Sequence, residues 1–230
     1  MGGKKKTVVL SLGGSQIIPD DIGYSYLKKF KDVVLKHKKD YNFVVVCGGG
    51  SLARKYITAV KKEKGNEYLQ SLAGISATRA NARFMYYFFG NDAIHGVPHT
   101  KRTVKKYLKK DGIVFCGALE YKDNQTSDSV AAVLARKFKG EFVNLTNVKG
   151  LYTKDPSKYK DAKFVPEITW DAFDKIVQKM KFKPGQHFVL DQGASVIIKK
   201  KKIPTYVIKD IKDLDKYLSG EQFVGTAIKG

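Results

Sequence analysis

Two short segments of the chain carry residue types that bind phosphate groups. Residues 43–54 combine an apolar strand-like stretch, three consecutive glycines and, in the predicted first turn of a helix, Arg54. Glycine lets the backbone approach a ligand closely, and the free N–H groups at the positive end of a helix favour an anion. Residues 8–15 repeat the design, because an apolar run leads into the paired glycines Gly13 and Gly14. The repetition predicts a site for two phosphate-bearing groups.

Two later segments place short polar side chains at predicted element ends. Residues 125–135 begin with hydroxyl groups and a carboxylate and continue as a helix of small residues. Hydroxyls at a helix start either cap that helix or donate to a phosphate oxygen above it. Residues 145–156 follow a strand, and Tyr152 among them could stack on a base at the strand end where α/β sheets bind ligands. Taken alone, the first segment is a capped helix and the second a loop.

These segments require a sheet that brings them to one edge. Apolar runs predict strands at Thr7–Leu12, Phe43–Cys47, Ile113–Cys116, Glu141–Leu145 and Pro204–Ile208. Helical periodicity covers residues 20–39, 51–62, 68–89, 127–138, 170–180, 193–201 and 213–218. This alternation predicts an α/β fold with an open, mostly parallel central sheet sandwiched by helices. At 230 residues, we expect one domain spanning 1–230.

Composition indicates the general class of binding partner but not a particular one. The 43 basic and 22 acidic residues give a net charge of +21, which attracts polyanions in general. No compact RNA or DNA motif accompanies the lysines, so we favour solvated helix faces over a dedicated nucleic-acid groove. The sequence shows no membrane-length apolar run and no signal-peptide pattern, so a cytoplasmic location without a membrane partner is expected. Cys47, Cys116 and the four histidines lack metal-ligand spacing, so no metal site is expected and the cysteines are predicted to be buried thiols.

In order and spacing, these segments resemble the amino acid kinase family, and most closely its archaeal-type uridylate kinases. The resemblance rests on SLGGS at 11–15, CGGGSLARKYI at 47–57, GISATRANARF at 74–84, QTSDSVAAVLA at 125–135, TNVKGLYTKDP at 146–156 and GTAI at 225–228. It implies the amino acid kinase fold, with ATP and an acceptor placed end to end over the carboxyl edge of the sheet. The implied reaction is ATP-dependent phosphorylation of UMP to UDP, in a homo-oligomer that is a dimer or a hexamer. The acceptor part would span roughly residues 1–140 and the ATP part roughly 141–230.

The same resemblance assigns roles to individual residues. On the transferring phosphate it places Gly13, Gly14, Ser15 and Arg54. Around ATP it places Ser11, Gly50, Arg54, Thr146, Asn147, Tyr152 and Asp155. Around the acceptor it places Gly49, Ser71, Thr126, Ser127 and Asp128. Phosphoryl transfer needs mainly in-line placement and charge compensation, which backbone amides, cations and a Mg²⁺ ion carried on the nucleotide phosphates can supply.

Three departures from the family pattern leave alternatives open. Ser11 stands where many members carry a lysine, and the candidates to replace that charge are Lys6, Lys154 and Lys183. Ser71 stands where uridylate kinases tend to have an aspartate that accepts ribose hydroxyls, and the acceptor loop at 119–127 lacks the usual Pro-Gly. The turn at 183–187 resembles a loop near the nucleotide in these kinases. The alternatives are a kinase for another small phosphate or carboxylate acceptor, and a catalytically silent nucleotide- or polyanion-binding homologue.

Overall fold

A computed structural model of the chain describes residues 5–19, 21–93, 96–121, 126–154, 156, 159–179 and 190–230. The strands are β1 (Lys6–Leu12), β2 (Tyr41–Cys47), β3 (Ile113–Cys116), β4 (Glu141–Leu145), β5 (Leu151–Tyr152), β6 (Phe164–Val165), β7 (Glu167–Ile168), β8 (Thr205–Ile208) and β9 (Gly225–Ile228). The α-helices are α1 (Gly14–Ile17), α2 (Tyr24–His37), α3 (Gly50–Lys62), α4 (Glu67–Phe89), α5 (Lys101–Asp111), α6 (Ser127–Phe138), α7 (Trp170–Lys179), α8 (Gln192–Lys201) and α9 (Ile211–Ser219). A 3₁₀ turn, η1, spans Gly90–Asp92.

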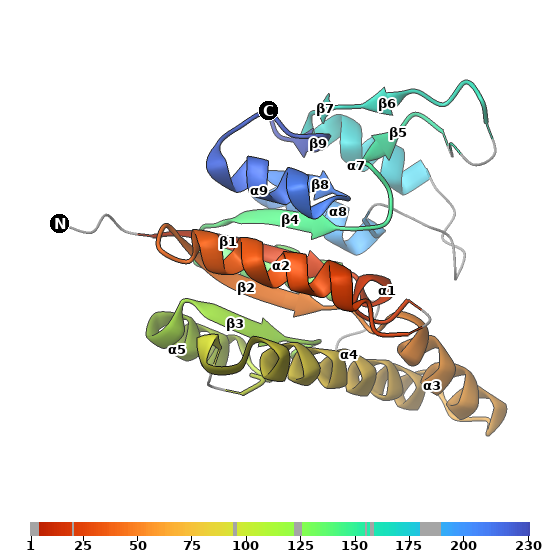
Figure 1. The fold of residues 1–230 in the computed structure, drawn as a ribbon. Coiled ribbons are helices and arrows are strands. Elements are labelled where there is room, and N and C mark those ends of the chain that lie inside the picture. The colour runs from red at the N-terminus through yellow and green to blue at the C-terminus, as the bar shows by residue number, and fades with distance from the viewer. Residues whose placement is uncertain are drawn as a thin grey trace.

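The central sheet has the strand order β3-β2-β1-β4-β8-β9-β7, and Figure 1 shows the arrowheads of β2, β3 and β4 pointing the same way. The pairs from β3 to β8 are parallel, while β9 runs antiparallel to β8 and β7 runs parallel to β9. Leu12 is in register with both Cys47 and Leu145. The loops after β1, β2 and β4 therefore leave the sheet side by side, and the expected mostly parallel α/β sheet is confirmed.

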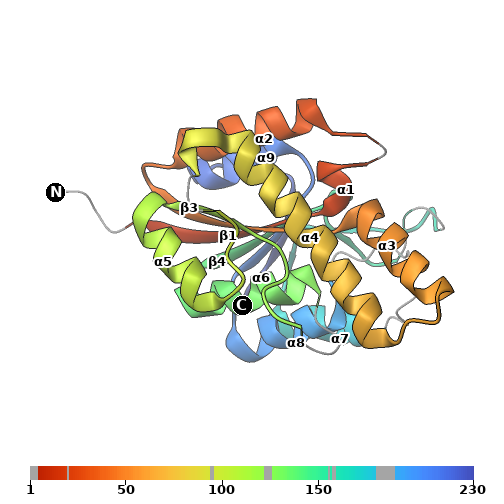
Figure 2. The same cartoon turned by 90° about the horizontal axis from the view of Figure 1, so that it is seen from below.

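Helices cover both faces of the sheet, as Figure 2 shows. One core joins α1, α2, α4 and α9 to the sheet, and the other joins α5, α6, α7 and α8 to its opposite face. Side chains alternate between the faces along β1: Val8, Leu10 and Leu12 belong to the first core and Val9 to the second. By the same alternation, Ser11 faces the second core, which brings its hydroxyl to α6.

The five predicted strands and seven predicted helices are present, with ends shifted by at most four residues within the described ranges. The elements that periodicity missed include α1, α5 and the short strands β5, β6, β7 and β9. Strands of two residues are too short to show an alternating pattern, and β9 is only four residues long. Cys47 and Cys116 are buried as expected, in the cores on opposite faces of the sheet.

Helices α3 and α4 form a pair that extends past the sheet edge in Figure 1. Along α3 no side chain is fully buried, whereas α4 buries residues only from Ala77 onwards. The second half of α4 thus anchors the pair to β2 and β3. In the described part of the chain, no helix is both long and apolar enough to cross a membrane.

Candidate active site

The two glycine loops contact each other through their backbones. A methyl group added at Gly14 would lie 2.1 Å from the amide nitrogen of Gly50, and one added at Gly48 would lie 2.7 Å from the amide nitrogen of Gly14. Gly50 also has a positive φ of 57°, which side chains rarely adopt, at the residue where α3 begins. The N–H of Gly13 donates to the carbonyl oxygen of Leu145 over 3.3 Å. The ends of β1, β2 and β4 thus form one continuous backbone surface.

Helix α4 supports the glycine loop that follows β2. The buried amide of Asn81, 2% exposed, donates to the carbonyl oxygen of Gly48 over 2.7 Å. The hydroxyl of Thr78 accepts the N–H of Ala118 at 2.9 Å, while Arg79 donates to the carbonyl oxygens of Ala118 and Leu119 at 3.1 and 2.7 Å. One helix therefore fixes both the loop after β2 and the segment after β3.

These three α4 residues were not identified from the sequence as site residues. They lie within the GISATRANARF segment, which supported only the resemblance. The available signal was chemical: an amide and a hydroxyl occur among the small and apolar residues of a helix that also bears Ala77, Ala82 and Met85. Buried polar side chains of this kind are satisfied by specific partners, here the ends of two neighbouring strands.

A second polar cluster joins β1, α6 and α8. The hydroxyl of Ser11 donates to a carboxylate oxygen of Asp128 over 2.6 Å. The hydroxyl of Thr126 donates to Asp191, and that of Ser129 donates to the other oxygen of the same carboxylate over 3.2 Å. Asp191 also caps α8 by accepting the N–H of Ala194 at 2.9 Å. Asp191 is the principal site residue that the sequence did not indicate.

The carboxyl group of Asp128 in this cluster has a perturbed pKa. Burial and, to a smaller extent, the nearby charge of Asp191 raise the pKa of Asp128 to about 7, against the lowering effect of the hydrogen bond from Ser11. Near neutral pH, Asp128 therefore exchanges between its protonated and ionised forms.

Thr126 is also the N-cap of α6, because its hydroxyl oxygen accepts the N–H of Ser129 at 3.2 Å.

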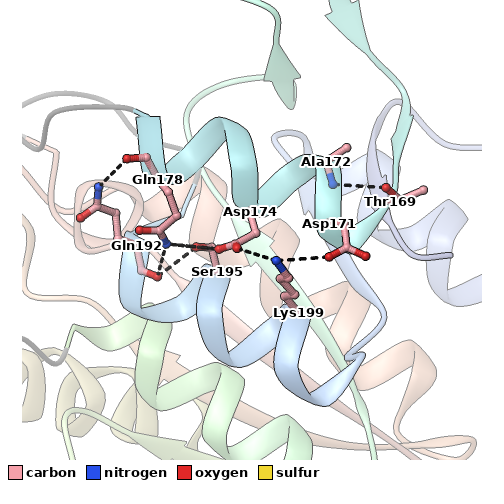
Figure 3. Close-up of polar contacts among 8 residues, drawn as sticks. All are labelled: Thr169, Asp171, Ala172, Asp174, Gln178, Gln192, Ser195 and Lys199. Carbon is pink, nitrogen blue, oxygen red and sulfur yellow. Dashed lines mark hydrogen bonds and ion pairs between the residues drawn. The ribbon is translucent and has the colours of Figure 1, made fainter.

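Figure 3 shows how α8, which carries Asp191 at its start, is fixed against α7. The fully buried hydroxyl of Ser195 donates to Asp174 over 3.0 Å. Lys199 contacts the other Asp174 oxygen at 3.1 Å and Asp171 at 3.2 Å. The amide of Gln178 donates to both Asp174 and Ser195. This network sets the position of α8 and, through its first turn, that of Asp191.

On the other side of the glycine loops, Thr146 follows β4 and donates its N–H to the carbonyl oxygen of Ile208 at 3.1 Å. Asn147 is exposed, and the half-buried ring of Tyr152 packs edge-on against Phe164 at 5.5 Å. The buried hydroxyl of Thr226 accepts the N–H of Leu151 at 2.8 Å and donates to the carbonyl oxygen of Val165 at 2.6 Å. The GTAI segment thus supports the β5–β6 hairpin.

The remaining predicted residues occupy more open positions. Ser15 is exposed in α1, and Arg54 is exposed on α3, one turn after Gly50. Ser71 is half-buried on α4, where α4 packs against α3, and Ser127 is half-buried at the start of α6. Asp155, the loop at 122–125 and the turn at 183–187 lie outside the described residues.

The three lysines proposed to replace the charge that is absent at Ser11 lie in different places. Lys6 begins β1, so it lies about 20 Å from Gly13 at the opposite edge of the sheet and does not replace a charge at Ser11. Lys154 pairs with Asp161 at 2.6 Å and lies over the ring of Tyr159. Lys183 falls among the residues that are not described.

No group of three or more His, Cys, Asp or Glu side chains that could hold a metal ion occurs within the described ranges. The two carboxylates of the polar cluster, Asp128 and Asp191, are engaged with hydroxyl groups.

Comparisons with known proteins identify the family and agree with the fold. The profile of the amino acid kinase family matches residues 6–209. A curated protein from Thermococcus kodakarensis named uridylate kinase is 33% identical over 225 residues, covering 96% of this chain and 99% of that protein. Another, from Methanoregula boonei, is 35% identical and covers 97% of both chains. The crystal structure of uridylate kinase from Archaeoglobus fulgidus superposes with a TM-score of 0.84 at 32% identity, covering 96% of this chain and 99% of that one.

Proposed function

Because the chain belongs to the amino acid kinase family, we propose that it is a UMP kinase, which transfers the terminal phosphoryl group of ATP to UMP and yields UDP and ADP. The similarity to proteins named uridylate kinase extends over nearly the whole chain. The observation that carries the proposal is the backbone contact between Gly14 and Gly50 at the carboxyl ends of β1 and β2. It joins the two predicted phosphate loops into one surface.

The chain contributes placement and charge rather than covalent chemistry. The glycine loops present backbone to the phosphates, and their contact with Leu145 and Asn81 makes that surface rigid. Fixed polar groups stabilise transferring phosphoryl charge because they need not reorganise during the reaction. Arg54, exposed one turn into α3, supplies the positive charge beside them.

The two substrates occupy opposite sides of the glycine contact in this proposal. ATP lies toward Thr146, Asn147 and Tyr152, where an aromatic ring and short polar side chains can receive adenine and ribose. UMP lies toward Gly49, Ser71 and the start of α6. Mg²⁺ enters on the ATP phosphates, where it compensates their negative charge.

The acceptor is best tested by competition among phosphate and carboxylate compounds. Coupled ADP release is measured with UMP, CMP, acetylglutamate, carbamate and isopentenyl phosphate at equal concentrations. The highest kcat/KM is expected for UMP. Turnover with another acceptor and no turnover with UMP would favour the second candidate, a kinase of this fold with a different substrate. Ser71 is the observation that favours this candidate, because its side chain lacks a carboxylate to accept ribose hydroxyls.

Arg54 provides a direct test of charge compensation. Arg54→Ala should lower kcat at least about a hundredfold while the protein stays folded, as for other lost charge-stabilising contacts. Lys55→Ala removes a neighbouring exposed charge from the same helix and should leave kcat within about twofold of the parent. Equal turnover in the Arg54→Ala variant and the parent would remove Arg54 from the site.

Assembly and location complete the proposal. Homo-oligomerisation draws support from the exposed aromatic ring of Tyr87 beside half-buried Phe84 and Phe88 on α4. Sedimentation equilibrium distinguishes a monomer from a dimer or a hexamer. A cytoplasmic location accords with use of ATP, and fractionation of the source cells tests it.

A further inference from the structure

The edge of the sheet opposite the active site carries a dense group of positive charges. The parallel topology explains it: α5, α6 and α8 precede β3, β4 and β8, so the three helices end where those strands begin. Figure 2 shows these helices on the same face of the sheet. Ten exposed basic residues lie on the last two turns of these helices or just after them and form what we call the basic rim: Lys105, Lys106, Lys109, Lys110, Arg136, Lys137, Lys139, Lys200, Lys201 and Lys202.

The basic rim differs from the basic residues on the opposite face. There, Lys28 pairs with Asp32 at 2.5 Å and Lys36 with Asp215 at 2.8 Å. Lys38 likewise pairs with Asp92 at 2.6 Å. Within the described ranges, none of the ten rim residues forms an ion pair. In the described part of the chain, the rim thus gathers ten exposed charges without an ion pair on three neighbouring helix ends, whereas Lys28 and Lys36 of α2 are paired and Lys29, on the same helix, is not.

Helix stability accounts for part of the rim. Positive charge stabilises the last turn of a helix, which accounts for the rim residues Lys109, Lys110, Arg136, Lys137, Lys200 and Lys201. Lys139 and Lys202 end α6 and α8 with positive φ angles of 52° and 48°. Glycine usually takes such positions because a side chain is strained there. Two rim lysines thus occupy a backbone conformation that side chains disfavour, as Lys64 also does after α3.

The size and chemistry of the rim fit a nucleic-acid backbone. From β3 to β8 the sheet advances by four strand spacings, so the rim is about 20 Å wide. Of the exposed large hydrophobic side chains in the described ranges, Val196 alone lies on α5, α6 or α8. A membrane-binding face needs apolar groups to insert, whereas phosphate binding needs only closely spaced cations. We propose that the basic rim binds RNA through its phosphates, independently of sequence, while the nucleotide site on the opposite edge stays accessible.

The test is binding of a fluorescein-labelled 20-nucleotide single-stranded RNA at 50 and 200 mM salt. With four to six phosphate contacts, affinity should fall about a hundredfold between these conditions. The rim variant Lys106→Glu/Lys137→Glu/Lys201→Glu should weaken binding at least about thirtyfold at 50 mM salt. It should also reduce the slope of log affinity against log salt by about 2.

A control variant separates a localised surface from net charge. Lys29→Glu/Lys61→Glu/Lys216→Glu reverses three exposed lysines on α2, α3 and α9 and, like the rim variant, has a net charge of +15 in place of +21. Beyond about 10 Å, charges are largely screened at 0.1 M salt, so the control should lose less than about threefold in affinity. Equal losses in the two variants would overturn the proposal.

Further measurements test the stability of the variants and the choice of RNA as the partner. If the rim variant unfolds at a lower urea concentration than the parent, the variant Lys106→Gln/Lys137→Gln/Lys201→Gln is used in its place. This glutamine variant should also weaken RNA binding, whereas the control with glutamine at Lys29, Lys61 and Lys216 should not. A dissociation constant above about 10 µM for the unmodified protein and RNA at 50 mM salt would overturn the proposal. So would tighter binding to vesicles of phosphatidylserine and phosphatidylcholine than to RNA. RNA binding requires no turnover, so its result is independent of the kinase assay.

Discussion

The pKa of Asp128 leads to a specific prediction about folding stability. Its carboxyl group has a pKa of about 7 in the folded protein, against an ordinary value of 3.8. A group with a raised pKa binds its proton more tightly in the folded state, so unfolding becomes easier as pH rises from about 4 to about 7. Asp128→Asn keeps an oxygen to accept the Ser11 hydroxyl and removes the titration.

The magnitude follows from the shift. About three pKa units correspond to roughly 4 kcal/mol over the whole window, of which about 3 kcal/mol falls between pH 4.5 and pH 8. The free energy of unfolding is measured by urea denaturation of both proteins at these two pH values. Relative to the parent, Asp128→Asn should gain about 3 kcal/mol on going from pH 4.5 to pH 8.

The control is Asp161→Asn, which changes a carboxylate with a side chain 67% exposed. Its stability difference from the parent should stay within about 0.5 kcal/mol across the same pH range, since exposed ion pairs contribute little. The reasoning is refuted if Asp128→Asn shows the same flat profile, because the Asp128 carboxyl would then ionise in the folded protein as it does in water.

Two substitutions test the support of the glycine loops. Asn81→Ala removes the buried donor to Gly48, so the free energy of unfolding should fall by about 2 kcal/mol. The same variant should bind ATP more weakly by isothermal titration calorimetry; unchanged stability and affinity would show that the loop needs no such support. Gly14→Ala places a methyl group 2.1 Å from the Gly50 nitrogen, whereas the nearest atom to one at Gly13 lies at 3.4 Å. Urea denaturation should therefore find Gly14→Ala about 1–3 kcal/mol less stable than Gly13→Ala, and equal stabilities would contradict the close contact between the loops.

Local sequence patterns located most of the elements that build the site. The strands that end at Leu12, Cys47 and Leu145 read as apolar runs followed by glycine or polar residues, and each run is visible without knowledge of its neighbours. The motifs on these loops also indicated the family, which the family profile and relatives confirmed. What a short window encodes, such as periodicity, a cap or a turn, survives into the fold because the interactions involved are local.

Tertiary structure alone decided which polar groups meet. Thr126 lies 65 residues from Asp191, Ser11 lies 117 from Asp128, and Asn81 lies 33 from the carbonyl that it binds. Periodicity says which face of an element is buried but not which buried donor finds which acceptor, because that depends on strand order and helix placement. The sequence therefore determined the strands, their glycine loops and the class of chemistry. Chain topology determined the α4 support, the Asp128–Asp191 cluster and the gathering of lysines at the opposite edge, since each joins segments that only the folded sheet brings together.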